Sequence, residues 1–164
     1  MQIVIEAMTA ADWHAVAAIY AEGIAGGNAT FETAVPPWET WDAGHHASCR
    51  LVAQTAAGIV GWAALSPVSK RPVYRGVAEV SVYVAGAAQG HGVGKALLTA
   101  LINCAETAGF WTLQASIFPE NEASLAIHAG CDFRQLGRRE RVAQHHGVWR
   151  DTVLLERRSQ IVGV

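Results

Sequence analysis

The chain has 164 residues, of which 51% are hydrophobic and 16% charged, a balance typical of a globular domain and not of a disordered segment. Its formal net charge is −2, which gives no reason to expect a nucleic-acid partner. No apolar stretch is long enough to span a bilayer, and the first residues lack the features of a signal peptide. We therefore expect one domain over residues 1–164 and no membrane partner.

Hydrophobic periodicity and turn residues predict the elements of the first half of the chain. In chain order they are a strand at Ile3–Glu6, a helix from Trp13 to Gly26-Gly27, a short helix after Pro37, a hairpin of Arg50–Gln54 and Ile59–Leu65, and a strand at Val77–Val84. The short helix carries Trp38 and Trp41, which we expect in the core or at an interface.

The second half continues this alternation of strands and helices. The predicted elements are an amphipathic helix at Gly92–Ala108, a strand at Trp111–Ile117, a short helix at Glu122–Ala129, and a final hairpin of strands near Phe133–Arg138 and Val148–Glu156. A βαβ unit in the middle and a hairpin at the end favour an α/β domain built on a mixed sheet.

The cysteines and the paired histidines predict neither a disulfide nor a metal site. Cys49, Cys104 and Cys131 are odd in number and scattered, so a reducing cytoplasm is the expected location. The pairs at 45–46 and 145–146 are unsuited to metal binding, because adjacent side chains point in different directions. We expect both pairs on the solvated surface, and no metal.

The most informative segment is the glycine-rich turn Gln89–Gly94, which joins a strand to the strongest helix. The first backbone N–H groups of a helix are unpaired and lie at its positive end, and glycines let an anion approach them closely. A Walker A loop is excluded by Gln89 and Ala96, and a Rossmann fingerprint by Lys95. A bare glycine-rich turn without a ligand is the alternative.

The pattern Gln89-x-x-Gly92-x-Gly94 after a strand resembles the acyl-CoA signature of the GCN5-related N-acetyltransferase superfamily. This resemblance implies a mixed, mostly antiparallel sheet of six to seven strands, about four helices, and splayed central strands that hold acetyl-CoA. It implies that the turn binds the CoA pyrophosphate and that the strand backbone pairs with the pantetheine arm. The residues implied are Val82, Tyr83, Val84, Gln89, Gly90, His91, Gly92, Val93, Gly94 and Lys95.

Further blocks are similar to the phosphinothricin and methionine sulfone or sulfoximine N-acetyltransferases. They are Arg71-x-x-Tyr74, Glu79-x-x-Val82-Tyr83-Val84, Asn121-x-x-Ser124-x-x-x-His128 and Gly147-x-Trp149-x-Asp151. The similarity implies direct acetylation of a small amino acid or analogue in a ternary complex, a role in detoxification, and a homodimer. One departure is Asp132, where the family usually has glycine; Asp tolerates a left-handed backbone.

Glu79 is the candidate general base. Strand alternation places Val77, Glu79, Ser81 and Tyr83 on one face. A carboxylate within an otherwise apolar strand can accept the proton of an attacking ammonium, because burial disfavours its charged form. The alternative is an exposed glutamate without a role.

The resemblance gives roles to Asn121 and to two residues of the helix that follows it, of which His128 would lie near the thioester sulfur. His128 would protonate the leaving thiolate or orient the amine, Asn121 would contact the pantetheine arm, and Ser124 the phosphate region. The alternatives are a surface histidine and simple helix capping by Asn and Ser.

Two loops are expected to select the amine. Arg71, with Tyr74 and Arg75, would bind a substrate carboxylate, and Phe31 and Glu32 belong to a loop that resembles the family's cover over the pocket. Solvated charge and core packing are the alternatives. Trp149 and Asp151 are expected to be structural or pocket-lining. Two other functions stay open: acetylation of a different amine or a protein N-terminus, and acyl-CoA binding without catalysis.

Overall fold

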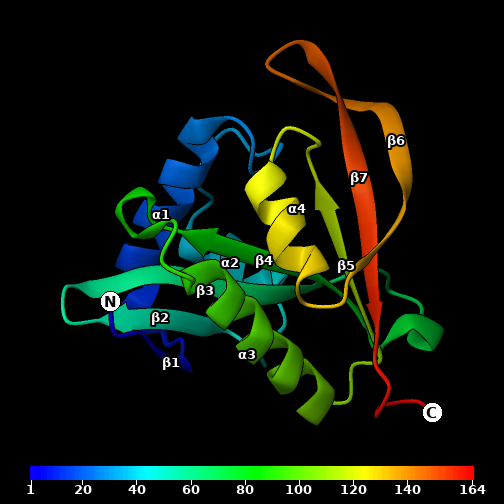
Figure 1. Ribbon diagram of the computed structural model, residues 1–164, viewed down its shortest axis with the longest axis horizontal. Coiled ribbons are helices and arrows are strands. Elements are labelled where there is room, and N and C mark those ends of the chain that lie inside the picture. The colour runs from blue at the N-terminus through cyan, green and yellow to red at the C-terminus, as the bar shows by residue number, and fades with distance from the viewer.

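A seven-stranded sheet runs through the computed structural model, which describes residues 1–164 (Figure 1). The strands are β1 (Val4–Ala7), β2 (Leu51–Thr55), β3 (Gly58–Pro67), β4 (Val77–Val84), β5 (Thr112–Ile117), β6 (Arg134–His145) and β7 (Val148–Arg158), in the spatial order β1-β2-β3-β4-β5-β7-β6. All neighbours are antiparallel except β4 and β5, which are parallel. The predicted mixed, mostly antiparallel sheet is confirmed.

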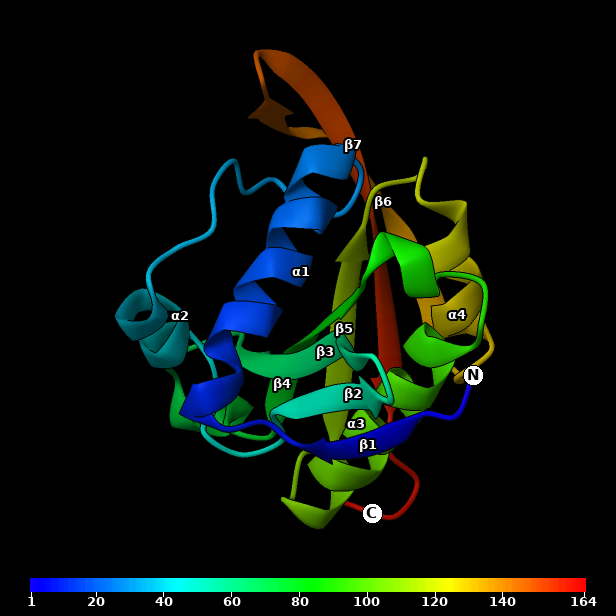
Figure 2. The ribbon, with the colours of Figure 1, turned by 90° about the vertical axis from the view of Figure 1, so that its left-hand side faces the viewer.

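Four helices cover the two faces of this sheet (Figure 2). Helices α1 (Trp13–Gly26) and α2 (Trp38–Gly44) lie on one face, and α3 (Val93–Thr107) and α4 (Glu122–Ala129) lie on the other. Three short 3₁₀ turns, η1 (Ala10–Asp12), η2 (Pro72–Tyr74) and η3 (Gly86–Ala88), connect the elements. None of the helices is both long and apolar enough to cross a bilayer.

The two faces have cores of different composition. On the α3 side, the predicted apolar stripe of Leu97, Leu98 and Leu101 is fully buried against the sheet. On the α1 side an aromatic cluster includes Trp41 and Trp62, each 1% exposed. The prediction that Trp41 belongs to the core is therefore confirmed, and the sheet is fixed from both sides.

Strands β4 and β5 pair only over their first three residues. Val77, Ala78 and Glu79 lie opposite Thr112, Leu113 and Gln114, whereas β4 continues to Val84 with β3 alone as its partner. Figure 1 shows the two strands diverging beyond this point. One edge of Val80–Val84 therefore has main-chain groups without a strand partner, as the resemblance implied.

The predicted element bounds agree with the structure to within a few residues, except in β6, which extends to His145. Two register shifts let this strand follow β7, and Arg141 there has a φ of 45°. Asp151 stabilises that irregularity, since its carboxylate accepts hydrogen bonds from Arg141 N at 2.7 Å and Arg138 Nε at 2.8 Å. Asp151 is thus structural. Asp132 has a φ of 67°, so aspartate does adopt the left-handed turn.

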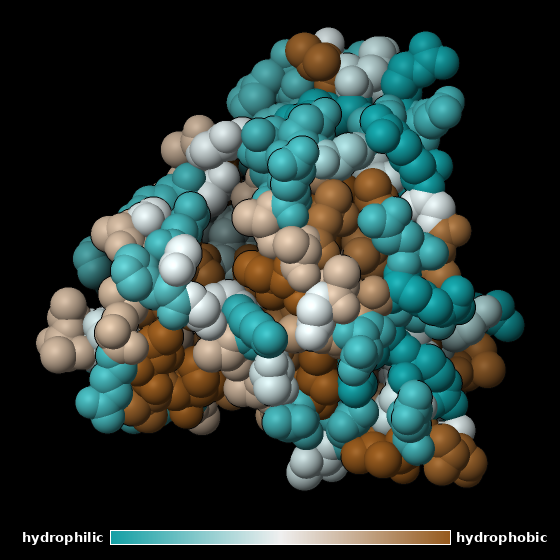
Figure 3. All heavy atoms as spheres, in the orientation of Figure 1, coloured by the Kyte–Doolittle hydropathy of each residue, from teal (hydrophilic) through white to brown (hydrophobic).

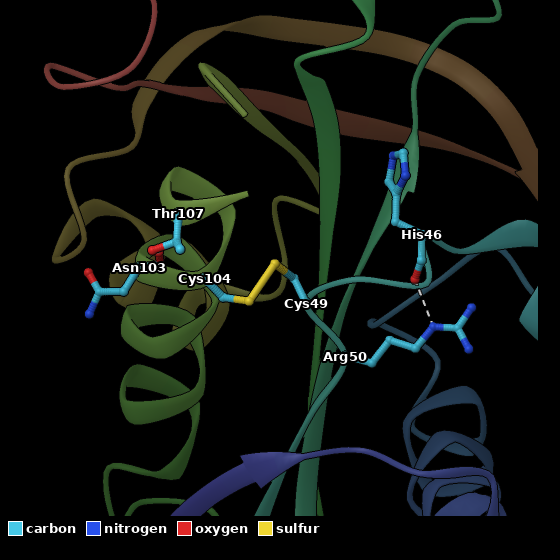
Figure 4. Close-up of a disulfide and its surroundings, with 6 residues drawn as sticks. All are labelled: His46, Cys49, Arg50, Asn103, Cys104 and Thr107. Carbon is cyan, nitrogen blue, oxygen red and sulfur yellow. Dashed lines mark hydrogen bonds between the residues drawn. A yellow bond between two sulfur atoms is a disulfide. The ribbon is translucent and has the colours of Figure 1, made fainter. Parts of the chain in front are cut away.

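The expectation that the cysteines do not pair was wrong. Cys49, just before β2, and Cys104, in α3, form a disulfide with a Cα–Cα distance of 5.6 Å (Figure 4), and Cys131 is free and buried. The two partners are 55 residues apart in sequence, and only the packing of α3 on the sheet brings them together. The cytoplasmic location stays a prediction, with less support.

The expected surface position of the paired histidines was also wrong for three of the four. His45 stacks on Trp41 at 4.1 Å, His46 packs edge-on against Phe110, and His145 is 5% exposed between Phe31 and Phe118. Only His146 is exposed. These side chains serve aromatic packing, and no group of three or more His, Cys, Asp or Glu residues could hold a metal ion.

Candidate active site

The turn before α3 has the backbone geometry of an anion site. Gly90 and Gly92 have φ values of 78° and 81°, which other residues rarely adopt. Gly92 is the N-cap of α3, so the amides that follow it form the unpaired first turn of a long helix. A Cβ on Gly94 would lie 2.9 Å from Ile127 Cδ1, so glycine there permits close contact between α3 and α4.

A cleft of about 450 Å³ begins at this turn and follows the free edge of β4 to α4. The space-filling view shows this face hollowed between α1 and α4 (Figure 3). Nearly all the residues predicted to bind acetyl-CoA line the cleft: Val82, Tyr83, Val84, Gln89, Gly90, Gly92, Val93, Gly94, Lys95, Asn121 and Ser124. His91 is the exception; it is exposed, and its Nδ1 lies 3.0 Å from Gln89 O.

A second, smaller cavity of about 240 Å³ opens from the cleft where β4 and β5 diverge. The two hollows share six residues: Ala29, Val82, Tyr83, Asn121, Ser124 and His128. Glu79 and Phe31 line only the smaller one. A thioester in the cleft would therefore lie next to a compartment of the size of a small amine.

Glu79 lies where it could serve an amine in that compartment. The half-buried carboxylate lines the cavity, and Gln114 Nε2 donates to its Oε1 at 3.4 Å. Gln114 is also its cross-strand neighbour in the last pair before the strands separate. The pairing therefore holds Glu79 at the apex of the splay.

His128 is buried in the wall between the two hollows, with 5% of its surface exposed. Burial lowers its pKa below the ordinary value, and the hydrogen bond to Ser124 only partly opposes this effect. Its Nδ1 donates to the Ser124 carbonyl at 2.7 Å, since a carbonyl can only accept. The neutral ring thus presents Nε2 as an acceptor, which suits the orientation of an amine better than protonation of a thiolate.

Tyr83 forms the aromatic side of the same wall. Its ring stacks on Trp62, its cross-strand partner, with 4.7 Å between the centroids, and lies 4.9 Å from the ring of Tyr20. Burial raises the pKa of Tyr83 well above its usual range, so the phenol stays protonated. Tyr83 therefore contributes a rigid, neutral side chain to the lining of both hollows.

Arg150 of β7 fixes the loop that covers the smaller cavity. Its guanidinium donates to Gly27 O at 2.8 Å, to Asn28 Oδ1 at 2.7 Å and to Glu120 Oε2 at 3.2 Å, and lies 3.9 Å from the Phe118 ring centre. Asn121 Nδ2 donates to Asn28 O at 3.1 Å, while Asn121 Oδ1 caps α4. Capping and cavity lining are thus both roles of Asn121.

Several predicted residues lie outside both hollows. Arg71 and Tyr74 are exposed and contact each other, with 5.6 Å between guanidinium and ring. Arg75 lies over Trp111, and Glu32 is exposed. Trp149 is 56% exposed on the final hairpin. A substrate-binding role for Arg71, Tyr74, Arg75 and Glu32 stays a prediction.

The architecture and sequence match a known family. The profile of the acetyltransferase (GNAT) family matches residues 13–133. The chain belongs to this family. A phosphinothricin N-acetyltransferase of Alcaligenes faecalis is 38% identical over 153 residues, which are 89% of this chain and 77% of the relative.

Two further proteins are similar to this chain in sequence or in structure. An L-methionine sulfoximine/L-methionine sulfone acetyltransferase of Pseudomonas aeruginosa is 36% identical over 107 residues, 65% of this chain and 62% of the relative. A phosphinothricin acetyltransferase of Sinorhizobium meliloti, solved with acetyl-CoA, superposes with a TM-score of 0.88 at 28% identity, covering 99% of this chain and 91% of that one. The protein is an acyl-CoA-dependent N-acetyltransferase.

The residues present fit acetyl-CoA, which supplies the activated acetyl group when bound. The helical first turn at Gly92–Lys95 offers amides to its phosphates, and the free edge of β4 offers main-chain groups to its amides. The N–H groups of that edge can stabilise the oxyanion that forms as the amine attacks. The chain's own contribution to this GNAT chemistry is therefore largely backbone on the acetyl-CoA side.

Sequence reasoning missed four side chains of the amine side. Ser81, Ser116 and Thr152 line the smaller cavity, and Arg150 anchors its cover. Ser81 could have been found, because strand alternation places it on the face of Glu79. Ser116 lies on β5 in no recognisable motif. Arg150 and Thr152 flank Asp151 of the Gly147-x-Trp149-x-Asp151 block on β7, but that pattern leaves position 150 unspecified and ends before position 152.

Proposed function

We propose that the protein acetylates the primary amine of a small amino acid or analogue of the phosphinothricin, methionine sulfone or methionine sulfoximine type. The observation that carries this proposal is the cavity of about 240 Å³ beside the acetyl-CoA cleft, with Glu79 on its wall. Such a volume is small for a ligand site, which favours a small amine. The names of the similar enzymes support the same substrate class.

Glu79 is proposed as the base that accepts the amine proton, directly or through one water molecule. His128 is proposed to orient the amine through its Nε2 lone pair, while Nδ1 stays bonded to the helix carbonyl. Transfer is direct, in a ternary complex. Cys131, the one free cysteine, is buried and lines neither hollow, which supports a mechanism without an acyl-cysteine.

The charge of the cavity favours a neutral group at the far end of the substrate. No arginine or lysine lines the cavity, and the nearby Arg150 already pairs with Glu120. An anion buried without a cation loses much of its hydration energy. We therefore propose that methionine sulfone and sulfoximine are better substrates than phosphinothricin, with detoxification of such compounds in the cytoplasm as the role.

We also propose a homodimer that uses the protruding β6–β7 hairpin. Leu136, Val148 and Trp149 are 43%, 61% and 56% exposed there, an unusual density of large apolar side chains on a free edge. Trp149→Glu should shift the protein to monomer in light-scattering measurements. A wild-type protein that is monomeric at high micromolar concentration would contradict the dimer.

Thiol release from acetyl-CoA tests the proposed function. The amines to compare are methionine sulfone, methionine sulfoximine, phosphinothricin, spermidine and an alanine-terminated peptide. Turnover should be fastest with the first two. Binding of CoA without turnover on any amine would favour a non-catalytic module, and preference for the peptide would favour a protein N-terminal acetyltransferase.

A further inference from the structure

Thr152 of β7 carries a buried hydroxyl that nothing in the chain uses. The residue is 4% exposed, and its Oγ1 makes no hydrogen bond. It lines the smaller cavity but not the acetyl-CoA cleft. The side chain therefore borders the compartment proposed for the amine and not the cleft proposed for the cofactor.

The sheet geometry explains why this side chain meets the cavity. Val153 and Leu155 point into the core beneath α3, so Thr152 points to the opposite face. Glu79 lies on that same face. Glu79 is paired with Gln114 of β5, Ser116 shares the face of Gln114, and Ser116 is paired with Leu154, which shares the face of Thr152. Figure 1 shows β7 alongside β5. Thr152 on β7 and Glu79 on β4 thus lie on the same face of the sheet, and both line the smaller cavity.

The chemistry of the residue points to a ligand. Buried hydroxyls without a partner are rare in native proteins because they lose their hydrogen bonds to water. Valine has nearly the same shape and an equal preference for strands, and would avoid this loss. The phenyl rings of Phe31 and Phe118, which line the same cavity, supply no hydrogen-bond acceptor of comparable strength.

We propose that Thr152 determines specificity by donating a hydrogen bond to an oxygen at the end of the substrate remote from its amine. β5 lies between β4 and β7, and β4 diverges from β5 after Glu79, so the backbones of β4 and β7 are at least two strand spacings, roughly 10 Å, apart. A group held at Thr152 is therefore not the amine served by Glu79. A sulfone or sulfoximine oxygen, which is bonded to the side-chain sulfur remote from the amine, can accept this hydrogen bond. This inference rests on the proposed function.

The test compares methionine sulfone with methionine, which lacks the two oxygens. Thr152→Val should lower the ratio of kcat/KM for the sulfone to kcat/KM for methionine roughly tenfold, the loss expected for one neutral hydrogen bond. Thr152→Ser, which keeps the hydroxyl, should retain at least half of that ratio. The melting temperature of Thr152→Val without ligands should equal or exceed that of the wild type.

Two outcomes overturn the inference. One is an unchanged ratio in Thr152→Val while the wild type still acetylates the sulfone, which leaves the proposed function intact. The other is a fall in melting temperature with equal losses on both substrates, which would make the hydroxyl structural. A wild type that turns over neither substrate but does acetylate another amine overturns the proposed function itself, and this inference with it.

Discussion

The two hollows of the active site are built in different ways. The acetyl-CoA cleft is lined mainly by one stretch of chain, β4 through the first turn of α3, together with α4 and with Gly23 and Ala29 in and after α1. The amine cavity is formed by side chains from β4, β5, β7, α4 and the loop after α1. Backbone recognition suits a cofactor that never changes, whereas side chains from several strands can vary with the substrate.

This difference indicates which residues can be changed to alter binding of acetyl-CoA and which to alter binding of the amine. Only His128, Tyr83 and their few neighbours belong to both walls. Changes elsewhere should affect one ligand and spare the other.

The largest effect is expected from Glu79→Gln, which removes the proposed base from the amine side. We expect kcat to fall about 10²-fold, with KM for acetyl-CoA nearly unchanged. The deficit should be greatest at low pH and shrink as the pH rises, because the amine then loses its proton without help. A pH–rate profile parallel to that of the wild type would remove Glu79 from the mechanism.

Gly92→Val should damage the acetyl-CoA side instead. A β-branched residue at a φ of 81° is strained, so the backbone amides of the turn should shift. We expect KM for acetyl-CoA to rise at least tenfold, which corresponds to a loss of roughly 1.4 kcal/mol in binding free energy. Gly58→Val is the matched control, since Gly58 has a φ of 114° in the β2–β3 turn, remote from both hollows. Equal changes in KM in the two variants would contradict a phosphate role for the turn.

His128→Gln tests the shared wall. We expect kcat to fall about tenfold. Because burial lowers the pKa of His128, the ring stays neutral through neutral pH and gains a proton only below the ordinary value of about 6.5. Wild-type activity that depends on its lone pair should therefore persist to below pH 6.5 and then fall, and that fall should be absent in the variant. A wild-type loss centred above pH 6.5 would argue against this role.

Arg150→Leu should have a smaller effect, confined mainly to the amine side. Without the guanidinium, the Gly27–Phe31 loop is free to move and must be ordered when the substrate binds, which should raise KM for the amine roughly fivefold. Arg134→Leu is the control, because Arg134 is 69% exposed and far from the loop. The prediction fails if both variants change KM alike.

The smallest effect on catalysis is expected from Cys49→Ala with Cys104→Ala. The bond joins α3 to the start of β2 outside both hollows, so kcat and both KM values should stay within twofold. Urea unfolding should show a loss of roughly 2–4 kcal/mol in the free energy of unfolding. Dithiothreitol should reproduce this loss in the wild type and leave the double variant unchanged; stability equal to the wild type would show that the bond is not formed.

Local sequence determined the elements and the backbone geometry of the turn that we expect to bind the cofactor. Periodicity predicted α3 and its buried Leu97 stripe, and the glycines at 90, 92 and 94 predicted the anion turn, because both signals act within a few residues of backbone. Glu79 could be predicted for the same reason, as the acidic position of an otherwise apolar strand. Alternation also put Ser81 on its face.

Tertiary structure alone decided the rest. Thr152 and Arg150 reach the amine cavity because β7 pairs with β5, and Cys49 meets Cys104 because α3 packs across the sheet. His45, His46 and His145 are packed among aromatic rings that come from distant segments. Each of these contacts depends on which strands are neighbours, and pairing between strands far apart in sequence leaves no periodic pattern at either residue.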